Sequence, residues 1–113
     1  MFKNYLTYQF ALSFHQLCLV ADMVDVPRKH RLLRSAEQMT QSFTRSLHAK
    51  SDVEEGRHFF SCLLNLREAK ESLEESGLFF GEIESKYRIL HERLEKLSEK
   101  AAKADDGQLV MLG

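Results

Sequence analysis

The chain has 113 residues, of which 43% are hydrophobic and 29% charged, and its formal net charge is −1. This length suits one domain, and this balance of apolar and charged residues excludes an intrinsically disordered chain. A nearly neutral molecule has no strong overall field toward nucleic acid or membrane. A single Pro and five Gly favour a few long elements over many short ones.

The first element is predicted as a helix over residues 4–24, because its apolar residues recur at helical spacing. They are Leu6, Phe10, Phe14, Leu17, Ala21 and Val24. Further aromatic residues on this helix, Tyr5 and Tyr8 among them, imply a second buried face.

A second helix is predicted to begin after Asp25, whose side chain accepts bonds from free amides, and Pro27 suits the first helical turn. Its apolar face consists of Leu32, Ala36, Met39, Phe43 and Leu47.

A third helix is predicted to start at a capping box formed by Ser51 and Glu54, and to stop at Gly77, where a left-handed residue is needed. Its apolar face consists of Phe59, Leu63, Leu66, Ala69 and Leu73.

The fourth helix is predicted over about residues 82–103, and it has the most regular apolar spacing in the chain. The residues on this face are Ile83, Tyr87, Leu90, Leu94, Leu97 and Ala101. Asp105, Asp106 and Gly107 predict its end.

Short connections make neighbouring helices antiparallel, so the predicted fold is all-α, an antiparallel up-down-up-down four-helix bundle. The bundle is expected over residues 1–104. Residues 105–113 are expected to form a flexible C-terminal tail, either frayed or docked on a neighbour through its apolar side chains.

More apolar surface is present than one bundle core requires, which predicts a homo-oligomer. The expected interface residues are Phe60, Leu64, Phe79 and Phe80. The alternative is that a compact bundle buries these side chains internally.

Cys18 and Cys62 lack a CxxC spacing and lie among apolar residues, which indicates two small buried side chains in a reduced cytosol. His15 and Gln16 interrupt the apolar run that a secretion signal would need. No stretch approaches the length of a membrane span. We therefore expect a cytoplasmic protein without membrane contact.

Catalytic and metal sites are not indicated. Glu55 and His58 have the Glu-x-x-His spacing of di-iron bundles, but such sites need a second copy of that motif and further inward carboxylates. No phosphate-binding loop and no nucleophile with a base and an orienting group can be recognised. We expect no enzyme activity, no metal and no cofactor.

Charge along the chain is uneven. Residues 27–50 carry six Lys and Arg against one Glu, and residues 51–76 carry seven acidic residues against three basic ones. Four of the cations gather where the second helix begins, although a helix start favours anions. The predicted nucleic-acid contacts are Arg28, Lys29, Arg31 and Arg34. The alternative is a solvated face or one that forms ion pairs between subunits.

The order of these features resembles the four-helix-bundle proteins encoded in 23S ribosomal RNA intervening sequences and the related accessory variability proteins of diversity-generating retroelements. The shared features are an aromatic first helix, Val26-Pro27-Arg28-Lys29, Ala49-Lys50-Ser51, Leu66 and Glu68 before Ser76-Gly77-Leu78-Phe79, and Glu84 with Tyr87. The resemblance covers roughly residues 4–100. It implies a bacterial cytoplasmic ring, typically a homopentamer, whose relatives bind nucleic acid or a reverse transcriptase.

Two hypotheses for function follow. The first is a non-catalytic accessory protein that binds RNA or DNA through the basic second helix, alongside a reverse transcriptase. The second is a scaffold that recruits an enzyme encoded nearby through apolar grooves or the C-terminal tail.

Overall fold

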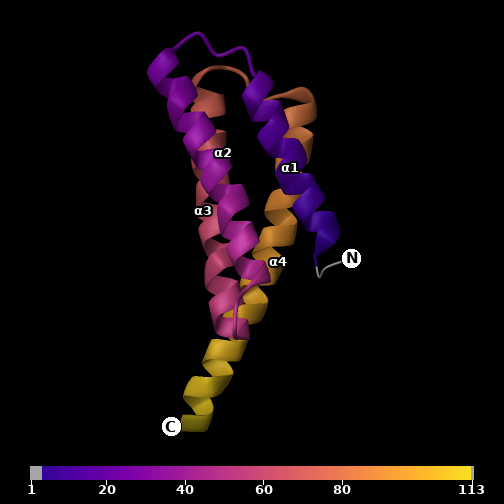
Figure 1. Cartoon of the computed structure of the whole chain (residues 1–113), viewed down its shortest axis with the longest axis vertical. Coiled ribbons are helices and arrows are strands. Elements are labelled where there is room, and N and C mark those ends of the chain that lie inside the picture. Colours follow the sequence, from indigo (N-terminus) through magenta and orange to yellow (C-terminus); the bar gives the residue numbers. More distant parts are fainter. Residues whose placement is uncertain (1–3, 113) are drawn as a thin grey trace.

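The structure is a computed structural model that describes residues 4–112, with side chains described for residues 4–99. It consists of four helices, α1 (Tyr5–Val20), α2 (Val26–Leu47), α3 (Asp52–Glu75) and α4 (Gly81–Leu112). No strand occurs within the described residues. The helices alternate in direction along the long axis, which confirms the predicted up-down bundle (Figure 1).

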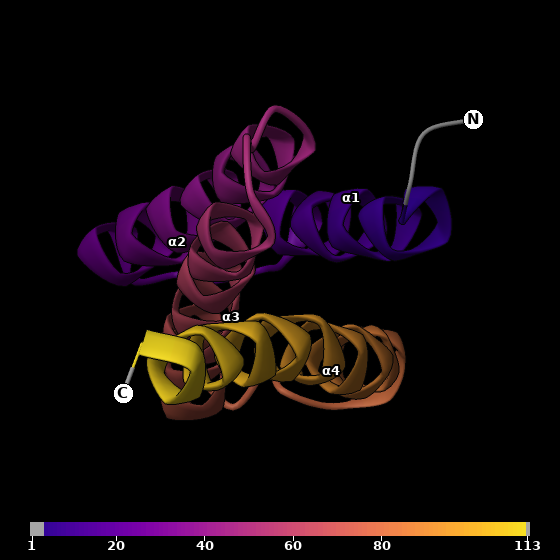
Figure 2. The same cartoon turned by 90° about the horizontal axis from the view of Figure 1, so that it is seen from below.

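Each helix packs on two others. α2 packs on α3 and α3 on α4, while α1 packs less extensively on α2 and α4. Seen from below, α3 lies between α2 and α4, and α1 lies on the same side as α2 (Figure 2). The first and last helices therefore close the bundle.

The core confirms the predicted faces of α2, α3 and α4. Almost all of the residues predicted there are buried, and Leu47 and Leu97 are partly buried at its margin. Ala101 lies outside the described side chains. Small polar residues also face this core, and the Ser42 and Ser61 hydroxyls lie 3.1 Å apart where α2 meets α3. This bond satisfies a polar group that burial would otherwise penalise.

The predicted apolar face of α1 is confirmed only in part. Phe14 is buried, and Phe10, Leu17 and Ala21 are partly buried against the core. Val24 is exposed, and the buried line is shifted by about one residue. Thr7, Ala11, Phe14 and Cys18 are buried, whereas Leu6 is exposed. α1 contains no Lys, Arg, Asp or Glu, so no charged face marks its outer side. The Thr7 hydroxyl is compatible with burial because it accepts a hydrogen bond from the Arg93 guanidinium at 3.4 Å.

The predicted start of α2 and the predicted start and end of α3 are confirmed by their caps. The Asp25 side chain accepts from the Arg28 amide at 3.0 Å, and the Ser51 hydroxyl accepts from the Glu54 amide at 3.1 Å. The Glu54 carboxylate accepts in return from the amide of Lys50, one residue before the cap. Gly77 has φ +71°, and the Leu78 amide donates to the Leu73 carbonyl at 2.8 Å, which closes α3.

Two helix ends differ from prediction. α1 stops at Val20 instead of residue 24, and residues 21–25 carry the chain across the end of the bundle to α2. α4 continues through Leu112 instead of ending at residues 105–107. A glycine inside a helix costs only about 1 kcal/mol, and no proline follows to remove an amide from the helix. The predicted docking of side chains beyond residue 104 lies outside the described side chains.

Candidate nucleic-acid interface

The four predicted basic residues lie in the first turns of α2, but they have different surroundings. Lys29 points back to the end of α1. Its ammonium donates to the carbonyls of Cys18 at 3.0 Å, Leu19 at 3.1 Å and Ala21 at 2.5 Å. The Cys18 and Ala21 carbonyls also accept from the amides of Ala21 and Met23, and the end of a helix attracts a cation. Lys29 thus stabilises the junction of α1 and α2.

Arg28 also has a partner within the chain. Its Nε lies 3.3 Å from a carboxylate oxygen of Glu75 at the end of α3, and both side chains are about one-third exposed. The pair connects the start of α2 to the end of α3. Partial exposure limits the contribution of such a pair to roughly 1 kcal/mol or less.

Arg31 and Arg34 are exposed and belong to a longer row along the outside of α2. The spacing of this row alternates between three and four residues, so its members lie on one line of the helix. All six members are exposed, and none is a carboxylate. We call this row the α2 polar stripe: Arg31, Arg34, Gln38, Gln41, Arg45 and His48.

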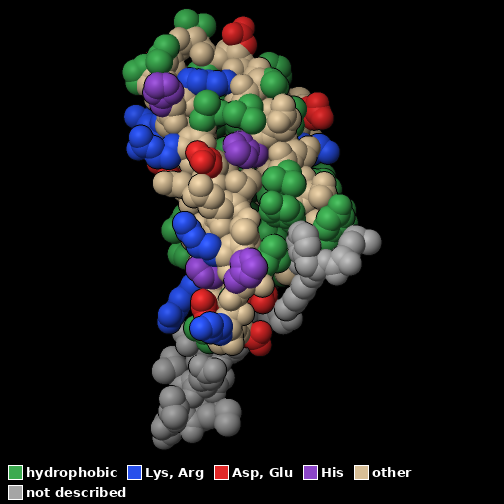
Figure 3. Space-filling model, in the orientation of Figure 1, with side chains coloured by type: hydrophobic (Ala, Val, Ile, Leu, Met, Phe, Trp, Pro, Cys, Tyr) green, Lys and Arg blue, Asp and Glu red, His purple; other side chains and the backbone are tan. Residues whose placement is uncertain are grey.

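The arginines of the α2 polar stripe make no ion pair with any described residue. The nearest carboxylate by sequence is Glu37, which lies beside the stripe and accepts a hydrogen bond from Gln41 at 3.3 Å. In Figure 3, Lys and Arg side chains lie on the side of α2 and α3, and hydrophobic side chains gather over α1. The stripe therefore offers exposed guanidinium groups that no described carboxylate neutralises.

Arg45 and the two glutamines were missed as members of this surface, because the prediction considered only the dense cluster at residues 28–34. The signal was present in the sequence as a repeat of polar residues opposite the apolar face of α2. An exposed helix face is as periodic as a buried one.

The predicted oligomer contacts occupy two separate places. Phe60 and Leu64 lie side by side on the outer face of α3, each about half exposed, whereas Phe80 is exposed in the connection to α4. Phe79 is partly buried, because its ring packs edge-on against Tyr87 at 5.2 Å between centroids. The exposed apolar residues of α1 were not predicted as surface: Tyr5, Leu6, Leu12, Leu19 and Val20.

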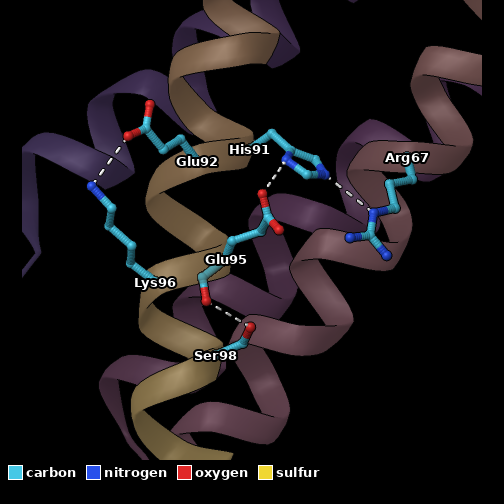
Figure 4. Close-up of polar contacts among 6 residues, drawn as sticks. All are labelled: Arg67, His91, Glu92, Glu95, Lys96 and Ser98. Carbon is cyan, nitrogen blue, oxygen red and sulfur yellow. Dashed lines mark hydrogen bonds and ion pairs between the residues drawn. The ribbon is translucent and has the colours of Figure 1, made fainter.

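His91 is held in a polar chain between α3 and α4, which the sequence did not indicate (Figure 4). Its Nδ1 lies 3.0 Å from the Glu95 carboxylate, and its Nε2 accepts from Arg67 Nε at 3.2 Å. Both ring nitrogens are therefore occupied. The Ser98 hydroxyl beside them donates to the main-chain carbonyl of Glu95 at 3.1 Å and makes no bond to His91 (Figure 4). The arrangement joins two helices and lacks a nucleophile that a histidine base could activate.

The Glu-x-x-His motif does not form a metal site in the described part of the chain. His58 lies 3.8 Å from Glu54, one turn before it on the same helix. Between residues 4 and 99 no group of three His, Cys, Asp or Glu side chains gathers around a common point. Both cysteines are free and buried, as predicted. No helix in this part of the chain has the length and apolar character needed to cross a membrane.

Comparisons with family models, curated proteins and solved structures find no match to this chain. The fold is a compact four-helix all-α protein, and its surfaces are the remaining guide to its function.

Proposed function

We propose that this protein is a non-catalytic accessory protein that binds the backbone of RNA or DNA through the α2 polar stripe. One observation carries the proposal: three exposed arginines, Arg31, Arg34 and Arg45, share a carboxylate-free line on one helix and have no ion-pair partner among the described residues. Guanidinium groups bind phosphate oxygens in a bidentate manner, and amide side chains add hydrogen bonds to sugar and phosphate.

The length of the stripe suits a backbone rather than a single phosphate. From Arg31 to His48 the helix rises by about 25 Å at roughly 1.5 Å per residue. A strand of duplex has a phosphate every ~3.4 Å along its axis, so several phosphates face such a stripe. Contacts to phosphate and sugar carry no sequence information, so the expected binding is independent of sequence.

A homo-oligomer would multiply these contacts. The α2 polar stripe of one chain contains only three arginines, and the chain has a net charge of −1. A single copy therefore binds nucleic acid weakly. Several copies on one nucleic acid add through effective concentration. The exposed apolar residues of α1 and α3 support such assembly, and the resemblance to intervening-sequence and retroelement proteins favours a homopentamer, with a reverse transcriptase as a further partner.

The test is fluorescence anisotropy with labelled duplex RNA and duplex DNA at several salt concentrations. The double variant Arg31→Glu/Arg34→Glu removes two cations of the stripe, and Arg57→Glu on α3 is the matched control, because Arg57 is also exposed. Loss of two phosphate contacts per bound subunit flattens the log–log salt dependence by about 2. The control keeps the wild-type slope.

Lys29 is unsuitable for this test, because its charge reversal would place a carboxylate against three carbonyls of α1. Equal slopes for wild type, the double variant and Arg57→Glu would contradict binding by the stripe. No binding by the wild-type chain at low salt would contradict the function itself.

A second candidate function is a scaffold that recruits an enzyme encoded nearby through apolar grooves or the C-terminal tail. The observation in its favour is the uncharged outer face of α1, where Leu12 and Leu19 are exposed. Exposed apolar patches of this kind mark protein interaction sites. Co-purification of one defined protein that is lost in Leu12→Lys, with no retention of nucleic acid, would favour this function.

A further inference from the structure

The most exposed large apolar side chains of the described chain share one end of the bundle. Val24 is 89% exposed, Val20 66%, Phe80 64% and Val26 61%. Val20 and Val26 flank the α1–α2 connection that contains Val24, and Phe80 lies in the α3–α4 connection. The two connections lie together at the top of Figure 1. The connection at the opposite end, residues 48–51, is polar apart from Ala49. We call the first of these the apolar end.

Contacts within the chain hold the apolar end in place. The Lys29 ammonium fixes the end of α1 against α2, and the Arg28–Glu75 pair fixes the start of α2 against α3. Between these contacts lies an open hollow of about 220 Å³, lined by Asp22, Met23, Val24, Asp25, Arg28 and Ser76. The Ser76 hydroxyl oxygen is shielded from solvent and has no hydrogen-bond partner.

The apolar end also carries a net negative charge. Residues 22–31 and 74–84 together contain six carboxylates against three Lys and Arg, and one of the six, Glu84, is paired with Arg88 on the next turn of α4. Residues 45–58, around the opposite connection, contain three of each. The charge is therefore specific to the end that exposes apolar side chains.

Two of the three cations at this end already have partners within the chain. Lys29 is bonded to α1 and Arg28 is paired with Glu75. By contrast, Asp22, Glu74 and Glu82 are exposed and make no ion pair with a described residue. Carboxylates near an apolar patch select a partner of opposite charge and repel one of the same charge.

We propose that the apolar end docks a segment of a partner protein that is both apolar and basic. Phosphates of nucleic acid and of anionic lipids are repelled by its carboxylates, and so is the same end of a second copy of this chain. A Lys or Arg side chain of the partner fits the hollow: its methylene stem lies on Met23 and Val24, and its cation reaches Asp22. This inference is independent of nucleic-acid binding by α2.

The test uses three fluorescent synthetic peptides of equal length and measures their anisotropy with the full chain. The first is an amphipathic helix of Leu and Lys, the second replaces Lys with Glu, and the third replaces Leu with Ser. Two variants probe the site: Val24→Ser/Phe80→Ser removes apolar surface, and Asp22→Lys reverses one charge. Ile89→Ser is the matched control, because Ile89 is also an exposed apolar residue but lies on α4, outside this end.

The expected result is binding of the Leu–Lys peptide alone. Its affinity falls about tenfold or more in Val24→Ser/Phe80→Ser and in Asp22→Lys, and is unchanged in Ile89→Ser. Circular dichroism confirms that each variant keeps its helices.

Other outcomes overturn the proposal. Equal binding of the Leu–Glu peptide removes the role of charge, and binding unaffected by either site variant places the peptide elsewhere. A further outcome is that light scattering shows an oligomer of the wild-type chain whose mass falls in Val24→Ser/Phe80→Ser. That result would assign the apolar end to contact with a second copy of the chain. Retention of the wild-type chain on anionic vesicles, lost in the same variant, would assign it to a lipid surface.

Discussion

Lys29 and Arg31 lie two residues apart on α2 and serve different purposes. The Lys29 ammonium satisfies three carbonyls at the end of α1, whereas Arg31 is exposed to solvent without an ion-pair partner among the described residues. Two neighbouring cations thus contribute separately, one to the fold and one to the outer surface.

Replacing Lys29 by Met tests this division. The variant keeps most of the side-chain stem but removes the ammonium that donates to three carbonyls at the end of α1, which costs about 1–3 kcal/mol. We expect the urea midpoint to fall accordingly, while Arg31→Met, the matched control, stays within about 0.5 kcal/mol of wild type. Equal midpoints for Lys29→Met and wild type would contradict the capping role.

The buried thiols give the protein an alkaline limit. Burial raises the pKa of Cys18 and of Cys62 from 9.0 to about 12, because a thiolate loses its hydration in the core. The Cys62 thiol also donates to the Met39 carbonyl at 3.3 Å. Folding therefore favours the protonated thiols.

A folded-state pKa above the unfolded value means that this stability is fully present below pH 9 and is lost as the pH rises toward 12. Each thiol opposes folding by about 1.4 kcal/mol per pH unit in that window. We expect native thiols to resist a disulfide reagent at pH 8 and urea midpoints to drop above pH 9. In a Cys18→Ala/Cys62→Ala variant, the urea midpoint should fall less above pH 9 than it does in the wild type. An equal fall in the variant and the wild type would refute the role of the thiols.

At the scale of elements, the contrast between faces decided what the sequence could predict. α4 alternates Leu90 and Leu94 with charged residues, so its buried face could be predicted position by position. α1 has no charged residue, and its outer face mixes Leu12 with Gln9 and Gln16. The spacing of apolar residues then distinguishes poorly between the buried and exposed sides of α1. The sequence could not show that the buried line runs through Thr7 instead of Leu6.

The candidate site was predictable only in part for a related reason. The cluster at residues 28–34 is visible as composition, but the partners of Arg28 and Lys29 come from α3 and α1. Such contacts depend on where three helices end in space, which no local pattern encodes. Arg31 and Arg34 have no such partners, so the prediction and the structure agree on their exposure.

For the whole molecule, the remaining exposed apolar surface predicts self-association. Phe60 and Leu64 form an adjacent pair on α3 and should be covered in an oligomer. We expect light scattering at micromolar concentration to give a multiple of the chain mass, changed only modestly by salt because apolar burial dominates.

The double variant Phe60→Lys/Leu64→Lys should lower that mass, whereas Arg57→Gln on the same helix should not. A monomer mass for the wild-type chain would remove the prediction of an oligomer. An unchanged oligomer in the double variant would move its interface to the face of α1.

The closure of the bundle by α1 against α4 has a consequence for the route of folding. α2 and α3 are neighbours in sequence, so their contacts form over short loops, but the bond between Thr7 and Arg93 spans 86 residues. Contacts of such separation form late, because the intervening chain must first be ordered. Until then α1, a helix without charge, exposes the side of Phe14 that α4 will cover. The interval before closure is when this chain is most prone to aggregate.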